Sequence, residues 1–263
     1  GNEPDYSAIK FFIESIGIPY DTAFTLTPAA APGLAPQPRP LPPLTDGAKG
    51  LYQGIILTNG NMGYCYIPAG QSQVCASSIS PAGWQALDDY ARNFGVRTVS
   101  YYTWPEPRYG LAFQRVANTS VTPDVIRLAP ASTQVFPYLT RTATIKLQYS
   151  YAYLAAPAPA AGETTTPLLS VQGLTVAALH KKADGREYLA LTFDNNPHLL
   201  HSMVLNYGIL NWVTKGVFIG ARKVYIGPQV DDHFLANDLY VHGVAACTPS
   251  GFMTDPTADL ATV

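Results

Sequence analysis

Two runs of alternating apolar and polar residues, joined by an Asp-Gly turn, place the strongest constraint on how this chain can fold. The stretch LTVAALHKKADGREYLALTFD, residues 174–194, alternates with period two on both sides of Asp184-Gly185. Such alternation is typical of strands, and an Asp-Gly pair between two alternating runs is the strongest short-range signal for a β-hairpin. The sequence therefore predicts an antiparallel hairpin at this point.

The residues before this hairpin carry the same signal. Residues 143–156, ATIKLQYSYAYLAA, alternate with period two and contain several aromatic side chains. Aromatic and β-branched residues favour strands. We therefore predict a strand-rich region from about residue 120 to 194, which includes 143–156 and forms an antiparallel insertion or extension of the sheet.

Helices and strands alternate in the first hundred residues. Apolar residues at helical spacing predict a helix over 6–16 that ends at Gly17. A second helix follows Ser80, with Ser80 as N-cap and Pro81 as the first helical residue, and ends at Gly95. The apolar runs GLYQGIILT and VRTVSYYT on either side of this helix read as strands. Alternation at this spacing predicts a layered α/β domain with parallel strands.

Three further segments complete the chain. The stretch PAAAPGLAPQPRPLPPL is rich in proline, which fixes φ and lacks an N–H donor, so an extended connector outside regular pairing is expected over 28–46. Apolar residues predict a helix over 197–216. The next run, KVYIGPQV, reads as a strand that delivers Asp231 and Asp232 at its carboxyl end, where parallel α/β sheets collect active-site residues.

Composition narrows the classes of partner. Charged residues make up only 13% of the 263 residues and the net charge is −2, so no electrostatic footprint for nucleic acid is present. The 17 tyrosines and 23 prolines suit an extracellular, carbohydrate-facing protein. No apolar run is long enough to predict a transmembrane span, and no signal-peptide pattern opens the chain.

The cysteines also favour an oxidising compartment. Cys65 and Cys75 lie in GYCYIPAGQSQVCASS, where a small disulfide ring closes easily and contributes roughly 2–3 kcal/mol. The alternative is two unrelated buried thiols. Cys247 is then a free thiol or pairs with a cysteine elsewhere. The sequon Asn118-Thr119-Ser120 agrees with secretion.

An aromatic loop is the candidate binding site. The segment SYYTWPEPRYG, residues 100–110, offers four side chains that can stack on sugar rings: Tyr101, Tyr102, Trp104 and Tyr109. The alternative is that these rings pack inside the protein. For the second aromatic run, YSYAY at 149–153, packing against a sheet is an equally good interpretation.

Acidic and histidine pairs are the candidate metal ligands. Of two adjacent carboxylates at a strand end, one can bind a divalent metal while the other accepts a proton from metal-bound water. The alternative for Asp231-Asp232 is an acidic turn or a helix cap. His198 and His201 stand three residues apart on one predicted helix and can share a metal, although a cap-region residue and a half-buried polar residue describe them equally well.

The order of several segments resembles a known family. These segments are GIPYD, ISPAGWQALDDYARNFGVRTVSYYTWPEPRYG, DGREYLALTF and LNWVTKGVFIGARKVYIGPQVDDHFLANDLY. Together they resemble the secreted polysaccharide deacetylases of the galactosaminogalactan type, from about residue 6 to the end of the chain. The resemblance implies an N-terminal carbohydrate-binding region followed by a metal-dependent deacetylase barrel. It implies that Asp231 is the general base and that Asp232 is a ligand of a divalent metal, with zinc expected.

The family also needs two metal-binding histidines after the aspartates. The later histidines here are His233, inside the motif, and His242, and they do not supply that pair. The resemblance therefore predicts that the chain is an N-terminal fragment, mainly a glycan-binding region, that is inactive alone. The expected partner is an N-acetylated amino-sugar polymer outside the cell. A non-catalytic carbohydrate-binding module and a self-assembling surface protein are the two alternatives.

The predicted fold class is α/β: a layered sheet rich in parallel strands, with an antiparallel extension and the first strand of a truncated β/α barrel. The predicted divisions are an α/β part over 1–118 with its connector at 28–46, a β-rich extension over 119–194, a closing helix over 195–218, and the start of the barrel over 219–263.

Overall fold

The computed structural model describes residues 4–31, 33–217, 238–240 and 252–254. The chain divides into two units, Gly1–Arg222 and Lys223–Val263. In the second unit, β16 (Asp238–Tyr240) pairs antiparallel with β17 (Phe252–Thr254). The predicted barrel strand, with Asp231 and Asp232, lies outside the described residues, as does Cys247.

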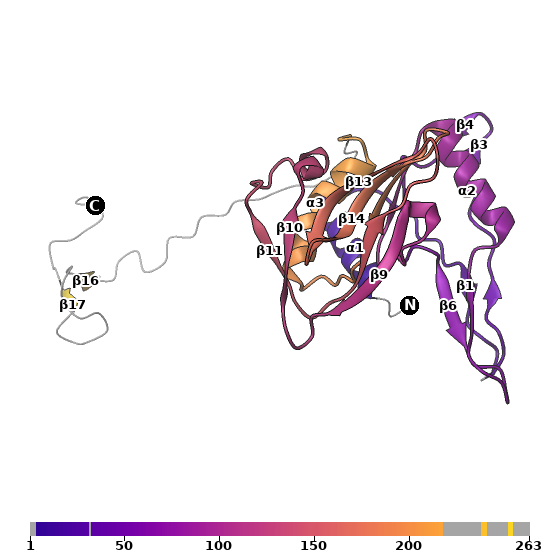
Figure 1. Ribbon diagram of the computed structural model, residues 1–263, viewed down its shortest axis with the longest axis horizontal. Coiled ribbons are helices and arrows are strands. Elements are labelled where there is room, and N and C mark those ends of the chain that lie inside the picture. Colours follow the sequence, from indigo (N-terminus) through magenta and orange to yellow (C-terminus); the bar gives the residue numbers. More distant parts are fainter. Residues whose placement is uncertain (1–3, 32, 218–237, 241–251, 255–263) are drawn as a thin grey trace. The chain divides into compact units, whose positions relative to one another are not determined.

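The first unit is built on a curled, mixed sheet of nine strands (Figure 1). Seven strands follow the order β11-β10-β13-β14-β15-β8-β5, while β12 pairs with β14 and with β9. The bounds are β5 (Gly54–Leu57), β8 (Arg97–Ser100), β9 (Leu111–Asn118), β10 (Asp124–Leu128), β11 (Thr144–Leu147), β12 (Tyr151–Pro157), β13 (Thr164–Val171), β14 (Leu174–Lys181) and β15 (Glu187–Leu191).

The α/β class is confirmed, but the sheet is mixed and not rich in parallel strands. The parallel pairs are β15 with β8 and β8 with β5, and the remaining pairs of this sheet are antiparallel. The reason is that β13, β14 and β15 follow one another through tight turns, which join antiparallel neighbours. These strands extend the same sheet to which β5 and β8 belong.

The Asp-Gly hairpin is confirmed. In its turn, the Lys182 N–H donates to the Arg186 carbonyl at 2.9 Å, and Gly185 adopts φ +88. The alternating run over 143–156 forms strands as predicted, but not one continuous strand. The chain breaks into β11 and β12 around Tyr149, whose φ of +54 turns the backbone out of the extended conformation.

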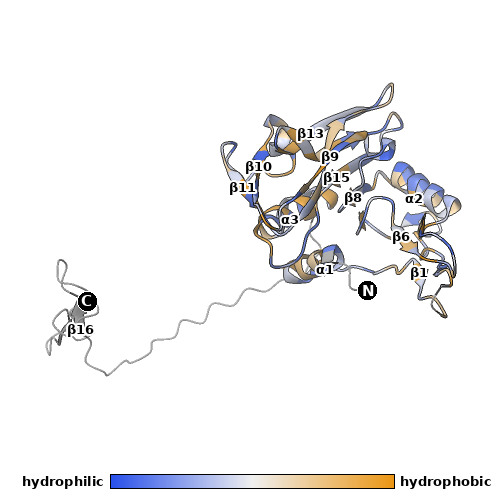
Figure 2. Ribbon diagram, turned by 60° about the horizontal axis from the view of Figure 1, so that its bottom comes forward, coloured by the Kyte–Doolittle hydropathy of each residue, from blue (hydrophilic) through white to orange (hydrophobic). Residues whose placement is uncertain are grey.

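Three α-helices accompany the sheet in the described residues: α1 (Pro4–Ile16), α2 (Pro81–Phe94) and α3 (Leu200–Val213). The predicted caps of α2 are confirmed: the Ser80 hydroxyl accepts from the Gly83 N–H, and Gly95 is left-handed with φ +62. Helices α1 and α3 pack against each other, and their apolar residues share the main core with β8, β14 and β15. Figure 2 shows how apolar α3 is, in contrast to the hydrophilic residues along α2. No described helix is long and apolar enough to cross a membrane.

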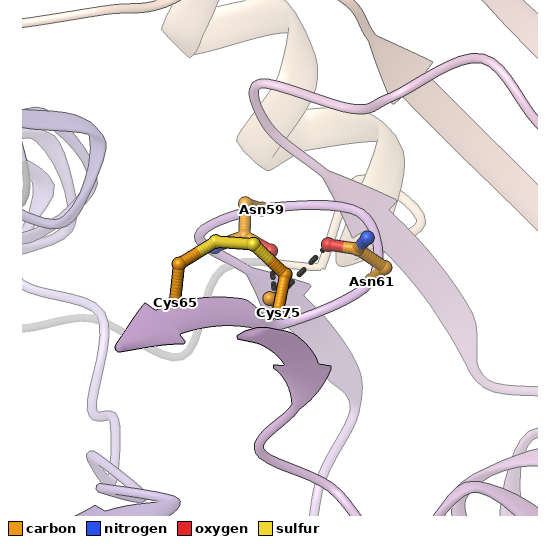
Figure 3. Close-up of a disulfide and its surroundings, with 5 residues drawn as sticks. Asn59, Asn61, Cys65 and Cys75 are labelled. Atoms are coloured by element: carbon orange, nitrogen blue, oxygen red, sulfur yellow. Dashed lines mark hydrogen bonds between the residues drawn. A yellow bond between two sulfur atoms is a disulfide. The ribbon is translucent and has the colours of Figure 1, made fainter. Parts of the chain in front are cut away.

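Short strand pairs and two 3-10 turns complete the unit. They are β1 (Leu26–Thr27) with β2 (Gln37–Pro38), β3 (Thr45–Asp46) with β4 (Lys49–Gly50), β6 (Gly63–Tyr66) with β7 (Val74–Ser77), and the turns η1 (Pro107–Tyr109) and η2 (Pro130–Gln134). The expectation that the proline-rich connector takes no part in pairing is therefore wrong at residues 37–38 and 45–46. A proline can occupy an edge strand, where no N–H donor is needed. The predicted disulfide Cys65–Cys75 is confirmed, and it joins β6 to β7 (Figure 3).

Candidate functional site

The aromatic loop after β8 places its side chains alternately inside and outside the protein. Tyr101 and Thr103 are buried, whereas Tyr102 is half-buried and Trp104 is 43% exposed. The strand alternation of β8 thus continues for four residues beyond its last paired residue. This alternation is the signal in the sequence that separates core tyrosines from surface ones.

Two of the four predicted sugar-stacking residues are structural. Tyr101 donates its hydroxyl hydrogen bond to the Asn206 side chain on α3, and Tyr109 donates to the Gly60 carbonyl. Both rings are completely buried, and burial raises the pKa of each phenol. The prediction that Tyr101 and Tyr109 stack on a sugar is therefore wrong, because no ligand ring can reach them.

Tyr102 and Trp104 instead join aromatic residues from the sheet. The Tyr102 ring stacks on Tyr153 of β12 with centroids 5.0 Å apart, and the two hydroxyls lie 3.1 Å apart. Trp104 stacks on Phe113 of β9 at 4.7 Å and meets Tyr153 edge-on at 5.0 Å. Tyr151 contacts Tyr153 at 5.8 Å. We refer to Tyr102, Trp104, Phe113, Tyr151 and Tyr153 as the aromatic cluster.

Strand register explains why these rings meet. Tyr151, Tyr153 and Ala155 alternate along β12, so they share one face of the sheet. Ala155 is paired with Phe113, because a bulge after Leu154 shifts the register of β9. Phe113 therefore lies on the same face as the two tyrosines. The sequence interpretation missed Phe113 and left the role of Tyr151 and Tyr153 open.

Two features make the aromatic cluster suitable for binding. Trp104 and Phe113 are 43% and 39% exposed, which is a high exposure for large apolar rings that already contact one another. Tyr102 has φ +38, and such backbone strain in a residue that is not glycine concentrates at ligand sites. Burial, and then the hydrogen bond with Tyr153, raises the pKa of Tyr102, so its hydroxyl stays protonated at neutral pH.

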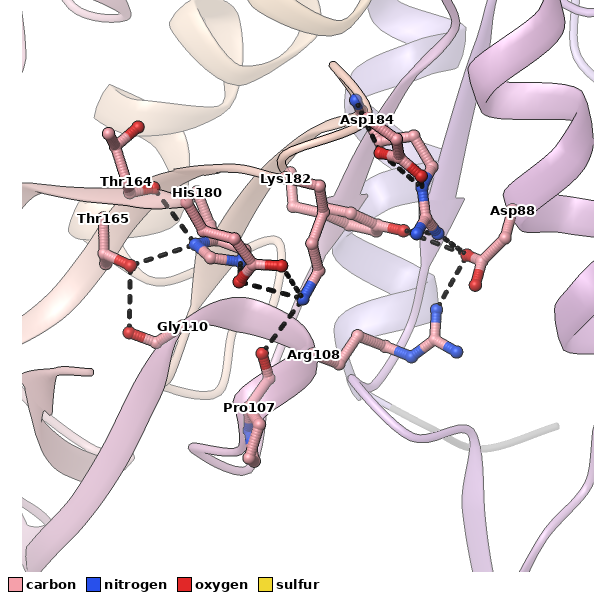
Figure 4. Close-up of polar contacts among 12 residues, drawn as sticks. Asp88, Pro107, Arg108, Gly110, Thr164, Thr165, His180, Lys182 and Asp184 are labelled. Carbon is pink, nitrogen blue, oxygen red and sulfur yellow. Dashed lines mark hydrogen bonds and ion pairs between the residues drawn. The ribbon is translucent and has the colours of Figure 1, made fainter. Parts of the chain in front are cut away.

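A charged cluster around Asp88 fixes the far end of the loop (Figure 4). The Asp88 carboxylate accepts from Arg108 in η1 at 2.9 Å, from Arg186 at 2.7 Å and from the Tyr188 hydroxyl at 2.9 Å. Burial alone would raise the pKa of Asp88, but the two guanidinium groups and the Tyr188 hydroxyl outweigh burial and hold it below its ordinary value. This cluster joins α2, η1 and β15 at the end of the loop that carries Trp104.

A second polar cluster, which we call the His180 cluster, holds the same loop from the sheet side (Figure 4). The Thr165 hydroxyl donates to the Gly110 carbonyl at 3.0 Å and lies 2.9 Å from His180 Nδ1. Lys182 donates to the Pro107 carbonyl at 3.2 Å and forms an ion pair with Glu163. His180 Nε2 lies 3.2 Å from a Glu163 oxygen without hydrogen-bond alignment. Burial, assisted by Lys182, lowers the pKa of His180, so the imidazole is neutral at pH 7.

His198 and His201, at the start of α3, are not brought together as a metal site. His201 is buried and its Nε2 lies 3.1 Å from the Asp194 carbonyl, whereas His198 precedes the helix and is exposed. No group of three or more potential ligand side chains occurs among the described residues. Asp231 and Asp232 lie outside that part of the chain, so their predicted roles stay predictions.

The chain matches a known protein family over most of its length. A family model described as Agd3 CBM87 matches residues 2–212, which is most of the chain. The chain belongs to the Agd3 CBM87 family. The abbreviation denotes a carbohydrate-binding module, so the family agrees with a polysaccharide partner. The region that it matches contains the whole aromatic cluster.

One solved structure supports the fold described above. The crystal structure of Agd3, described as a novel carbohydrate deacetylase, matches with a TM-score of 0.70 and 23% identity. The match covers 91% of this chain and 35% of that one, so the chain spans about a third of the length of its solved relative. A cytoplasmic protein, STM3548 from Salmonella typhimurium, matches at a TM-score of 0.40 and 8% identity over 62% of this chain and 72% of its own. No curated protein sequence matches this chain.

Proposed function

We propose that this CBM87 chain is the polysaccharide-binding region of a secreted, metal-dependent polysaccharide N-deacetylase, and that the aromatic cluster holds the polymer. The observation that carries the proposal is the row of contacting rings on one face of the sheet, in which Phe113 and Trp104 are exposed and Tyr153 is half-buried. Pyranose rings present C–H groups that pack on aromatic faces, and phenol hydroxyls can bind sugar hydroxyls.

The rigidity of the cluster supports this role. The Asp88 and His180 clusters fix the loop of Trp104 from two sides, so little conformational entropy is lost when a ligand is bound. The partner that suits these residues is a polymer with few charges, because the cluster itself carries no charged side chain. An N-acetylated amino-sugar polymer meets this description.

The deacetylase activity in this proposal rests on the resemblance to the family. Asp231 as general base and Asp232 as metal ligand are carried over from the family pattern, with zinc as the proposed metal. None of the described residues is given a catalytic role. Secretion is supported by the disulfide, since disulfides persist in oxidising compartments.

The experiment is a comparison of polymer affinity between two single variants. Trp104→Ala removes the central ring and should weaken binding of purified galactosaminogalactan by about 2 kcal/mol, roughly 30-fold, the range of an aromatic hot spot. Tyr207→Ala is the matched control, because Tyr207 is 51% exposed on α3 and outside the aromatic cluster. Calorimetric affinities that are equal for Trp104→Ala and the unmodified chain would refute the proposed site.

A further inference from the structure

A hairpin apart from the main sheet carries a pair of half-buried aromatic rings. Strands β6 and β7 form their own two-stranded sheet, and every residue of β7 is exposed. Tyr64 and Tyr66 are two residues apart on β6, so they share a face. Their rings are 6.1 Å apart and 19° from parallel. Within the described residues neither hydroxyl has a hydrogen-bond partner.

The hairpin is held rigid although it has almost no core of its own. An isolated two-stranded hairpin is marginal in water, so an additional constraint is needed. The disulfide supplies it, since Cys65 and Cys75 are directly opposed in the register (Figure 3). At the entry to β6, the Gly63 N–H donates to the side-chain oxygens of Asn59 and Asn61 at 2.8 and 3.0 Å. The ring pair is therefore fixed before any ligand binds.

The base of the hairpin rests on the loop that carries the aromatic cluster. Gly60 accepts the hydroxyl hydrogen bond of Tyr109, and a Cβ at Gly60 would come within 2.7 Å of the Thr103 side chain. Thr103 directly precedes Trp104 in the chain. The hairpin and the aromatic cluster thus share one rigid support.

The chemistry of the hairpin indicates its ligand. No Asp, Glu, Lys, Arg or His occurs from Leu51 to Leu87, a stretch that contains both strands and their turn. The polar side chains of the turn and strands are amides and hydroxyls: Gln71, Ser72, Gln73 and Ser77. Amides and hydroxyls beside aromatic rings match a neutral or N-acetylated sugar, whereas a charged ligand would find no counter-charge in this stretch.

We propose that the β6–β7 hairpin is a second binding site for a neutral or N-acetylated sugar polymer, with Tyr64 and Tyr66 as its stacking surface. One long polymer can then contact the hairpin and the aromatic cluster, which raises its affinity through effective concentration. The choice of a polysaccharide as ligand rests on the proposed function. The location of the site rests on the hairpin alone.

The test uses the double variant Tyr64→Ala/Tyr66→Ala in the full chain. Binding of purified galactosaminogalactan should weaken at least about 10-fold, a threshold set below the roughly 10²–10⁴-fold that linking two sites can contribute. For a short N-acetylgalactosamine oligomer, titration should give two binding events per chain, and one event in either the double variant or Trp104→Ala. Tyr207→Ala is again the control.

A second variant covers the case in which the double variant fails to fold. Val74 pairs with Tyr66 and is 38% exposed, so Val74→Lys places a charge beside the rings without removing them. It should also reduce the oligomer stoichiometry to one. Two binding events in Val74→Lys or in the folded double variant overturn the second site. If only Trp104→Ala leaves binding unchanged, the aromatic cluster is wrong and the hairpin site stands.

Discussion

Replacing Gly110 with alanine tests whether the polar clusters hold the binding loop as tightly as their geometry indicates. Gly110 ends η1 with φ +60, a left-handed conformation that glycine adopts at no steric cost. A Cβ at this position would lie 2.1 Å from the Thr165 hydroxyl and 2.3 Å from His180 Nδ1. Both atoms belong to the buried His180 cluster and cannot move without breaking their own hydrogen bonds.

The expected loss of stability has two sources. The left-handed backbone costs an alanine about 1–2 kcal/mol. Insertion of a methyl group into a packed site costs typically about 1–3 kcal/mol more, as the neighbours shift. We therefore expect the free energy of unfolding to fall by about 2–5 kcal/mol for Gly110→Ala.

The assay is denaturant unfolding, with Gly173→Ala as the control. Gly173 has a similar φ of +79, but a Cβ there meets no atom within 4 Å. It should therefore lose only the backbone part, about 1–2 kcal/mol. Equal losses of unfolding free energy in the two variants would refute the reasoning. They would mean that Thr165 and His180 can move aside for the added methyl group at no cost.

Two further predictions concern the charged groups. The pKa of Asp88 lies below its ordinary value of 3.8, so the folded state favours the ionised carboxylate. The corresponding stability is present at neutral pH and is lost as the pH falls below about 4. Urea unfolding should thus show that the free energy of unfolding falls less from pH 7 to pH 3 in Asp88→Asn than in the unmodified chain. Equal falls in the two proteins would contradict the pairing of Asp88 with the two arginines. In a polypeptide that continues into an active deacetylase region, Asp232→Asn should abolish zinc binding, whereas Asp231→Asn should keep zinc and slow acetate release by about 10²–10⁴-fold. Full zinc stoichiometry in Asp232→Asn would contradict its role.

The elements that the sequence predicted well depend on local signals. The caps of α2 at Ser80 and Gly95, the Asp-Gly hairpin and the Cys65–Cys75 disulfide each involve residues close in the chain. Short-range chemistry decides such features wherever they lie in the fold. The mixed sheet was harder to predict from the sequence, because the partner of each strand depends on the whole topology.

The candidate site was only half predictable for the same reason. Tyr102 meets Tyr153 across 51 positions of sequence, and Trp104 reaches Phe113 through the pairing of β9 with β12. A bulge in β9 decides on which face of the sheet Phe113 lies, and no local sequence pattern predicts that bulge. The difference in burial between Tyr101 and Tyr102 could have been predicted, since the two residues continue the in-and-out alternation of a strand.

Protection of Trp104 by bound polymer is the most direct measurement of the central claim. Of the three tryptophans, Trp212 is buried, Trp84 is half-buried beneath Arg108, and Trp104 is the most exposed. Acrylamide quenching of tryptophan fluorescence should therefore fall when galactosaminogalactan saturates the chain, and Trp104→Phe should show no such fall. Unchanged quenching of the unmodified chain, while bound polymer is detected independently, would contradict the placement of the polysaccharide on the aromatic cluster.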